Sequence, residues 1–114
     1  MHELHVVQGI INQAIEKAKA NKAAKITKIV LVVGELLGFD EGSIRLYFDD
    51  LSKGTLLEGA ELTVKPVMAK FKCKECDQLF ERRKGEFSCP KCCSLNLLTE
   101  SGKEFFIDSM EIES

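Results

Sequence analysis

The sequence contains only two histidines, and both lie within its first five residues, at His2 and His5. It also lacks a serine–histidine–acid set and a glycine-rich loop of the kind that cradles phosphates. Histidine is the side chain that most often acts as a general base near neutral pH, so acid–base catalysis has few candidate residues here. We therefore predict that the protein is not an enzyme.

Long apolar stretches are also missing. No apolar run approaches the roughly 20 residues that a helix needs to span a bilayer. The first five residues, Met-His-Glu-Leu-His, lack the basic start, the sustained apolar segment and the small-residue cleavage site of a secretory signal. The formal net charge of −2 gives no general electrostatic reason to bind nucleic acid or a membrane surface. These absences predict a cytoplasmic protein without a membrane partner.

Hydrophobic periodicity is present in five segments. It predicts helices over residues 3–20 and 41–53, and strands over residues 25–33, 60–68 and 103–113. The first strand is rich in β-branched residues and almost continuously apolar in its second half, which is typical of a strand covered on both faces. Asp40 precedes the second helix and is a candidate N-cap. The fold class predicted by this pattern is α+β, with a small three-stranded sheet and two helices.

All five cysteines lie in a short segment between the last two predicted strands. Four of them form two pairs, Cys73-Lys-Glu-Cys76 and, twelve residues later, Cys89-Pro-Lys-Cys92. Two residues between cysteines let one tight turn direct both sulfurs at a single ion, and two such turns complete the tetrahedron that zinc prefers. A closed set of four protein ligands indicates a structural metal. The expected zinc ligands are therefore Cys73, Cys76, Cys89 and Cys92, and Cys93 is a spare thiol.

The cysteine segment interrupts the α/β pattern rather than following it. We predict a zinc-ribbon-like module at residues 70–98, inserted into an α/β domain formed by residues 1–69 and 99–114. The module has few apolar residues, and metal binding would contribute about 10–16 kcal/mol toward its folding. The connections near 69–72 and 98–102 are expected to be short linkers.

The N-terminus offers a second metal-binding arrangement. The free α-amine, the His2 backbone nitrogen and the His2 imidazole can close adjacent chelate rings on one ion. Such a nitrogen-rich set suits nickel or copper in a square-planar geometry, and Glu3 offers an oxygen donor if the ion is six-coordinate. His5 lies one helical turn further and could approach the same ion. Because a histidine imidazole has a reference pKa of about 6.5 and must be neutral to ligate, binding should depend on pH.

Two other functions are compatible with the cysteine motifs. CxxC pairs also occur in thiol oxidoreductases, although a redox motif usually needs only one pair. Residues 70–92 carry seven Lys or Arg against four acids, so the alternative function is a zinc-ribbon adaptor that binds nucleic acid or an acidic protein partner. Because these basic residues alternate with acids, a solvated charged surface is favoured and nucleic acid is a disfavoured partner.

Three features together resemble the HypA/HybF family of nickel metallochaperones for [NiFe]-hydrogenase maturation. They are the start Met1-His2-Glu3-Leu4, the segment Val33-Gly34-Glu35-Leu36 after a predicted strand, and the paired CxxC module followed by a closing strand. The similarity spans essentially the whole chain. One departure is Cys93, because glycine or histidine commonly follows the last cysteine ligand in the family.

This resemblance implies a specific role for each metal. Zn²⁺ would be structural, and Ni²⁺ would be a cargo bound at the N-terminus by His2 and Glu3, with Asp40 matching an acidic residue that some members add. The protein would deliver nickel to the hydrogenase large subunit or its maturation complex, together with a HypB-type GTPase. Some relatives serve urease as well.

Overall fold

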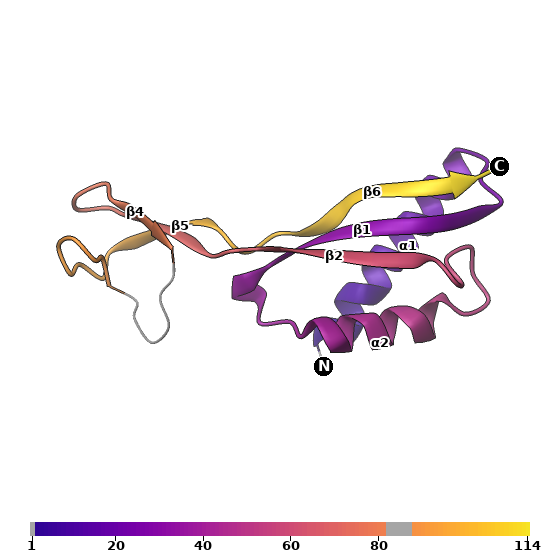
Figure 1. The fold of residues 1–114 in the computed structure, drawn as a ribbon, viewed down its shortest axis with the longest axis horizontal. Helices are drawn as coiled ribbons and strands as arrows, with labels where there is room; N and C mark the ends of the chain where they lie inside the picture. The colour runs from indigo at the N-terminus through magenta and orange to yellow at the C-terminus, as the bar shows by residue number, and fades with distance from the viewer. Residues whose placement is uncertain (1, 82–87) are drawn as a thin grey trace. The chain divides into compact units, whose positions relative to one another are not determined.

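Figure 1 shows the fold in a computed structural model, which describes residues 2–81 and 88–114, apart from the side chain of His2. The elements are α1 His2–Ala20, β1 Lys25–Gly34, the 3-10 helix η1 Glu35–Leu37, α2 Glu41–Ser52, β2 Glu61–Val67, β3 Lys70–Cys73, β4 Leu79–Glu81, β5 Leu97–Ser101 and β6 Phe105–Glu113. They group into two compact units. The α/β unit comprises Met1–Val32, Phe39–Lys65 and Phe105–Ser114, and the cysteine unit comprises Val33–Gly38 and Pro66–Glu104.

A three-stranded sheet with the order β2-β1-β6 forms the α/β unit together with the two helices. β1 and β2 run in the same direction, and α2 makes the crossover between them (Figure 1). β6 runs antiparallel to β1 and continues to the end of the chain, where the Ala24 N–H donates to the Glu113 carbonyl at 2.7 Å. Because β1 is central, its side chains are almost all buried, as the apolar run predicted.

The core of the α/β unit lies between the helices and the sheet. α1 and α2 pack against each other. The buried side chains of this core include Val7, Ile11, Ala14, Ala18, Ile26, Ile29, Leu31, Ile44, Phe48 and Leu57. Those of α1 recur at three- and four-residue spacing, so they form the single apolar face of an amphipathic helix. The predicted α+β class with two helices and a three-stranded sheet is therefore confirmed.

None of the described helices has both the length and the apolar composition needed to cross a membrane.

The cysteine unit contains a second small sheet, with the order β4-β3-β5. β3 pairs antiparallel with both neighbours, so that Phe71 lies opposite Phe80 on one side and opposite Thr99 on the other. The Phe71 and Phe80 rings are 5.9 Å apart at an interplanar angle of 38°. Among the residues of this unit that the structure describes, the buried apolar side chains outside β1 are Ala69, Phe71, Cys73 and Cys89. So small a core needs a further source of stability, as small metal-binding modules usually do.

The expectation of linkers near 69–72 and 98–102 is wrong. These residues lie largely in β3 and β5, which are hydrogen-bonded partners in one sheet. The pairing is irregular between Lys70 and Phe71, where a bulge shifts the register. Short strands with alternating charged residues carry little hydrophobic signal, so periodicity alone did not identify them.

Two backbone segments of the cysteine unit cross so closely that only glycine fits. The Gly34 N–H donates to the Glu104 carbonyl at 2.6 Å, and the Leu36 N–H donates to the Gly102 carbonyl at 2.8 Å. A Cβ added to Gly34 would overlap the Gly102 carbonyl group. Gly102 has a φ of 114°, and a Cβ there would lie 2.9 Å from the Ala69 Cα. Both glycines are therefore required by close backbone approach.

We expect Gly34→Ala to lower the free energy of unfolding by about 1–3 kcal/mol, because backbone atoms rather than flexible side chains oppose the added methyl group. Gly9→Ala is a matched control, since a Cβ on Gly9 in α1 meets no atom within 4 Å. The free energy of unfolding of this control should rise by about 0.5–1 kcal/mol, because alanine has a higher helix propensity than glycine. Chemical denaturation followed by circular dichroism measures both. Equal free energies of unfolding for the two variants would contradict the close approach of Gly34 to the Gly102 backbone.

Candidate metal centres

The four cysteines of the two CxxC pairs converge on one point in the cysteine unit. Their sulfur atoms all lie within 4.8 Å of one another. The Sγ atoms of Cys73 and Cys92 are 3.5 Å apart, and those of Cys76 and Cys89 are 3.6 Å apart. A tetrahedral zinc ion with Zn–S bonds of about 2.3 Å would separate its sulfur ligands by about 3.8 Å. The sulfur positions therefore fit a tetrahedral thiolate site.

Two turns of the same design position these sulfurs. In the first, the Cys73 N–H donates to the Gln78 carbonyl and the Asp77 N–H donates to the Cys73 carbonyl, both at 2.9 Å. In the second, the Cys89 N–H donates to the Ser94 carbonyl at 2.9 Å and the Cys93 N–H donates to the Cys89 carbonyl at 2.8 Å. The same pattern of hydrogen bonds therefore recurs sixteen residues further along the chain. Each CxxC pair is thus held by a closed, hydrogen-bonded turn.

Cys93 has a conformational role in its turn. It adopts a φ of 62°, and Asp77 adopts a φ of 60° at the equivalent place in the first turn. This left-handed conformation favours glycine, so a non-glycine residue there carries some strain. Cys93 is exposed and does not belong to the four-sulfur cluster. Cys93 therefore follows the last cysteine of the cluster in the sequence without being a fifth ligand candidate.

The clustered thiols have divergent pKa values because they lie so close together. Desolvation raises the pKa of Cys89, but the backbone amides of Cys92 and Lys91, with the neighbouring thiols, lower it to about 6. The Ser94 amide lowers the pKa of Cys92, whereas hydrogen bonding with Cys73 and desolvation raise it to about 12. Four adjacent thiolates therefore need a cation, and a divalent metal ion would favour the deprotonated form of all four and offset part of their charge.

The two residues predicted to supply carboxylate donors, Glu3 and Asp40, are joined by a hydrogen bond at the starts of α1 and α2. Glu3 Oε2 accepts a hydrogen bond from the Asp40 N–H at 2.9 Å. Asp40 Oδ2 accepts from the Ser43 N–H at 3.0 Å and from the Ser43 hydroxyl at 3.3 Å. Asp40 is therefore the N-cap of α2, as predicted, and Glu3 satisfies the backbone N–H of the capping residue itself.

The other predicted nickel donors lie at the edge of what the structure describes. The backbone of His2 begins α1, but its side chain and the whole of Met1 lie outside the described residues. His5 is exposed. The structure thus brings Glu3 and Asp40 together, and the roles of these residues and of His2 in nickel binding stay predictions.

Glu35 has a structural role that the sequence did not indicate. It belongs to the Val33-Gly34-Glu35-Leu36 segment, and its carboxylate accepts a hydrogen bond from the Ala69 N–H at 2.9 Å. The bond holds η1 against the start of β3 within the cysteine unit. No local pattern could predict it, because the two residues are 34 positions apart.

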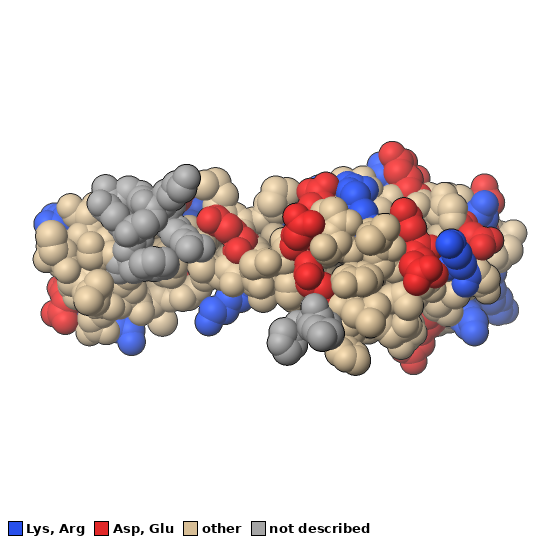
Figure 2. Space-filling view, turned by 90° about the horizontal axis from the view of Figure 1, so that it is seen from below, with Lys and Arg blue, Asp and Glu red and all other residues tan. Residues whose placement is uncertain are grey.

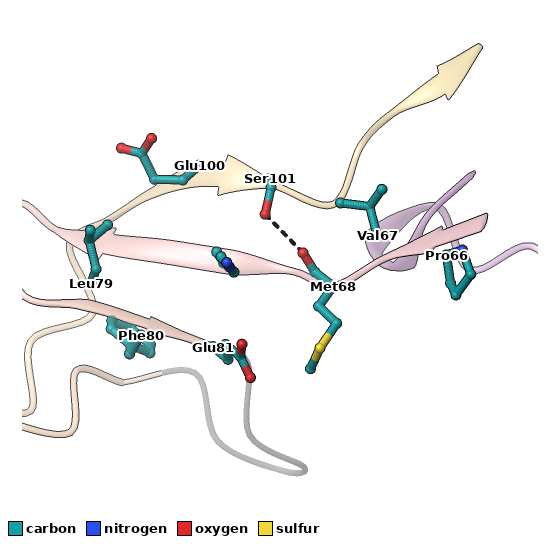
Figure 3. Close-up of a pocket in the computed structure, with 9 residues that line it drawn as sticks. Pro66, Val67, Met68, Leu79, Phe80, Glu81, Glu100 and Ser101 are labelled. Atoms are coloured by element: carbon teal, nitrogen blue, oxygen red, sulfur yellow. Dashed lines mark hydrogen bonds between the residues drawn. The ribbon is translucent and has the colours of Figure 1, made fainter. Parts of the chain in front are cut away.

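An open groove of about 770 Å³ lies on the cysteine unit beside β4 and β5. Figure 3 shows Met68 and Leu79 at this groove, and Ser101 Oγ donates to the Met68 carbonyl at 2.8 Å. The described residues that line it include acids, a lysine and apolar side chains, but no cysteine or histidine.

The charge distribution bears on the adaptor hypothesis. On the face of the cysteine unit shown in Figure 2, the lysine and arginine side chains of the described residues stand apart from one another, and Arg82, Arg83 and Lys84 lie outside the described residues. In β3, Lys70 lies directly opposite Glu81 of β4. The described part of this face therefore presents no continuous basic groove of the kind that follows a nucleic-acid backbone.

Comparison with known proteins identifies the family. Residues 1–112 match the family described as "HypA: Hydrogenase/urease nickel incorporation, metallochaperone, hypA". Hydrogenase maturation factor HypA of Caldanaerobacter subterraneus subsp. tengcongensis is 46% identical over 114 residues, covering 99% of this chain and all of the relative. The protein of the same name from Dehalococcoides mccartyi strain 195 is 39% identical, covering 99% of this chain and 95% of that one. The chain therefore belongs to the HypA family.

Solved structures agree with this assignment. The solution structure of the Ni metallochaperone HypA from Helicobacter pylori is similar with a TM-score of 0.71 and 28% identity, covering 98% of this chain and 97% of that one. A second HypA solution structure has a TM-score of 0.74 and 29% identity, covering 98% and 96%. The resemblance found in the sequence is thus confirmed, together with the fold.

We expect zinc-loaded protein to expose one fast-reacting thiol, Cys93, and to expose four more only when a chelator removes zinc. Cys89→Ser should lose stoichiometric zinc, because three thiolates leave the tetrahedron incomplete. Cys93→Ser is the matched control and should retain it. Zinc affinity should also fall as pH is lowered, since protons compete for the thiolates. Thiol titration with parallel zinc analysis measures these outcomes, and five reactive thiols without zinc release would contradict the site.

Proposed function

We propose that the protein is a nickel metallochaperone that binds Ni²⁺ at its N-terminus and delivers it for metallocentre assembly. The observation that carries this proposal is the match of residues 1–112 to a family described by nickel incorporation. The four-sulfur cluster adds independent support, because its spacing fits a structural zinc ion and not a transferable one.

The two metals have opposite requirements. Zn²⁺ would be held by Cys73, Cys76, Cys89 and Cys92, which leave no open position, and it would stabilise the fold of the cysteine unit. A transferable ion needs an exposed site with fewer protein ligands, so that a client can replace them one at a time. We assign nickel binding to the domain predicted at residues 1–69 and 99–114, and zinc binding to the module at 70–98.

The proposed nickel donors surround the start of α1. They are the amine of Met1 and the backbone nitrogen and imidazole of His2, with carboxylates from Glu3 and Asp40 when the ion is six-coordinate. The contact between the Glu3 carboxylate and the Asp40 N–H supports this grouping, because it places the second helix beside the first turn of α1. The proposal requires the Met1 amine to be free.

Delivery would proceed by ligand exchange rather than by catalysis, so we infer that the protein is not an enzyme. The partners we propose are a HypB-type GTPase and the hydrogenase large subunit or its maturation complex, with urease as a further client. These partners are intracellular, and we propose a cytoplasmic location accordingly. The family description, which includes both hydrogenase and urease, supports this range of clients.

We expect the protein with its native N-terminus to bind one equivalent of nickel in calorimetry. His2→Ala should abolish stoichiometric binding, because it removes the imidazole and opens the chelate. Extension of the chain by two residues before Met1 should have the same effect, since it converts the amine into an amide. Both variants should retain zinc. Undiminished nickel binding by His2→Ala would refute the proposed site.

A further inference from the structure

The two CxxC turns contribute their sulfurs to the cluster in mixed pairs. The Sγ atoms of Cys73 and Cys92 are 3.5 Å apart. Those of Cys76 and Cys89 are 3.6 Å apart. Each close pair therefore joins a sulfur of the first turn to a sulfur of the second. The cluster requires not only two closed turns but also a contact that holds one turn beside the other.

Asn96 makes contacts of this kind from the segment that leads from the second turn into β5. The Lys74 N–H of the first turn donates to the Asn96 carbonyl at 2.9 Å. Asn96 Nδ2 donates to Glu75 Oε1, also of the first turn, at 3.3 Å. The Asn96 N–H donates to Ser94 Oγ of the second turn at 3.0 Å. Asn96 therefore binds the first turn with its carbonyl and side chain, and the second turn with its N–H.

The side-chain bond is the part of this arrangement that depends on the residue at position 96. The carbonyl and the N–H belong to the backbone, whereas the bond to the Glu75 carboxylate needs an amide donor. Glu75 lies between Cys73 and Cys76 in the sequence, so the Asn96 amide holds the middle of the first turn. Loss of this bond would let the first turn move relative to the second.

The four clustered cysteines differ in their exposure to a competing chelator. Cys73 and Cys89 are buried, Cys76 is half-buried and Cys92 is exposed. A chelator would therefore reach the cluster at Cys92, which belongs to the second turn. Removal of the metal from that side requires the second turn to separate from the first, and a contact between the turns opposes this separation.

We propose that Asn96 is a positioning residue for the zinc site, and that its bond to Glu75 keeps the two CxxC turns together and slows zinc release. The inference rests on the zinc binding in the proposed function and deepens it. Neither side chain would touch the ion. The bond needs one donor and one acceptor, so two carboxylates at positions 75 and 96 would repel each other.

Zinc transfer from the zinc-loaded full chain to a chromophoric chelator tests the proposal. Asn96→Ala should release zinc about threefold to tenfold faster than the wild type, because it removes a hydrogen bond to a charged group. Asn96→Asp should release it at least as fast, because the new carboxylate faces Glu75. Glu75→Gln should stay close to the wild-type rate, since its side-chain oxygen still accepts from the Asn96 amide.

A double variant and a matched control make the test specific to this pair of side chains. Combining Asn96→Asp with Glu75→Gln should restore slow release, because the glutamine amide can donate to the new carboxylate. Ser101→Ala is the control, since it removes a side-chain hydrogen bond to the Met68 carbonyl at the other end of β5. It should leave the release rate unchanged. Circular dichroism of each zinc-loaded variant checks that it is folded.

The outcomes separate this inference from the zinc site itself. If the wild type binds zinc but Asn96→Ala releases it at the wild-type rate, the role of Asn96 is wrong and the zinc site stands. A double variant that releases zinc as fast as Asn96→Asp has the same consequence, as does equal acceleration by Ser101→Ala. If the wild type binds no zinc, both the site and the role of Asn96 are refuted.

Discussion

The proximity of four cysteine sulfurs, all within 4.8 Å of one another, is the constraint on which the cysteine unit depends. Four thiols at such distances cannot ionise together without a cation. Desolvation raises the pKa of Cys89, but backbone amides and neighbouring thiols lower it to about 6. The Ser94 amide lowers the pKa of Cys92, but hydrogen bonding with Cys73 and desolvation raise it to about 12. The unit's buried side chains are few, so the free energy of metal binding would replace much of the stability that a larger apolar core provides.

The strands and backbone contacts of the cysteine unit position the two CxxC turns next to each other. β3 ends at Cys73 and pairs with both β4 and β5, so the first turn emerges from the centre of the sheet. The backbone crossing of Gly34 with Gly102 and the hydrogen bond from Ala69 to Glu35 fix the start of these strands. The sulfur cluster therefore closes one end of the unit, and the glycine crossing closes the other.

Sequence reasoning succeeded where the signal was local. The CxxC spacing identified the four cysteines whose sulfurs cluster, helical periodicity located α1 and α2, and the position of Asp40 predicted its capping of α2. It failed where the signal was distributed along the chain. β3 and β5 are short, and their pairing joins residues far apart in the sequence, so hydrophobic periodicity predicts linkers where these strands lie. The contact between Glu3 and Asp40 spans 37 positions and has no local pattern at all.

The two proposed metal sites follow from one physical distinction between closed and open coordination. In this proposal the four cysteines on hydrogen-bonded turns would retain their ion, whereas the N-terminal donors, which leave coordination positions open, would release theirs to a client. Elemental analysis of untagged protein before and after nickel loading tests this distinction most directly. We expect one zinc per chain throughout, and one nickel per chain that appears on loading without loss of zinc. Nickel that replaces the zinc, or protein that takes up none, would contradict it.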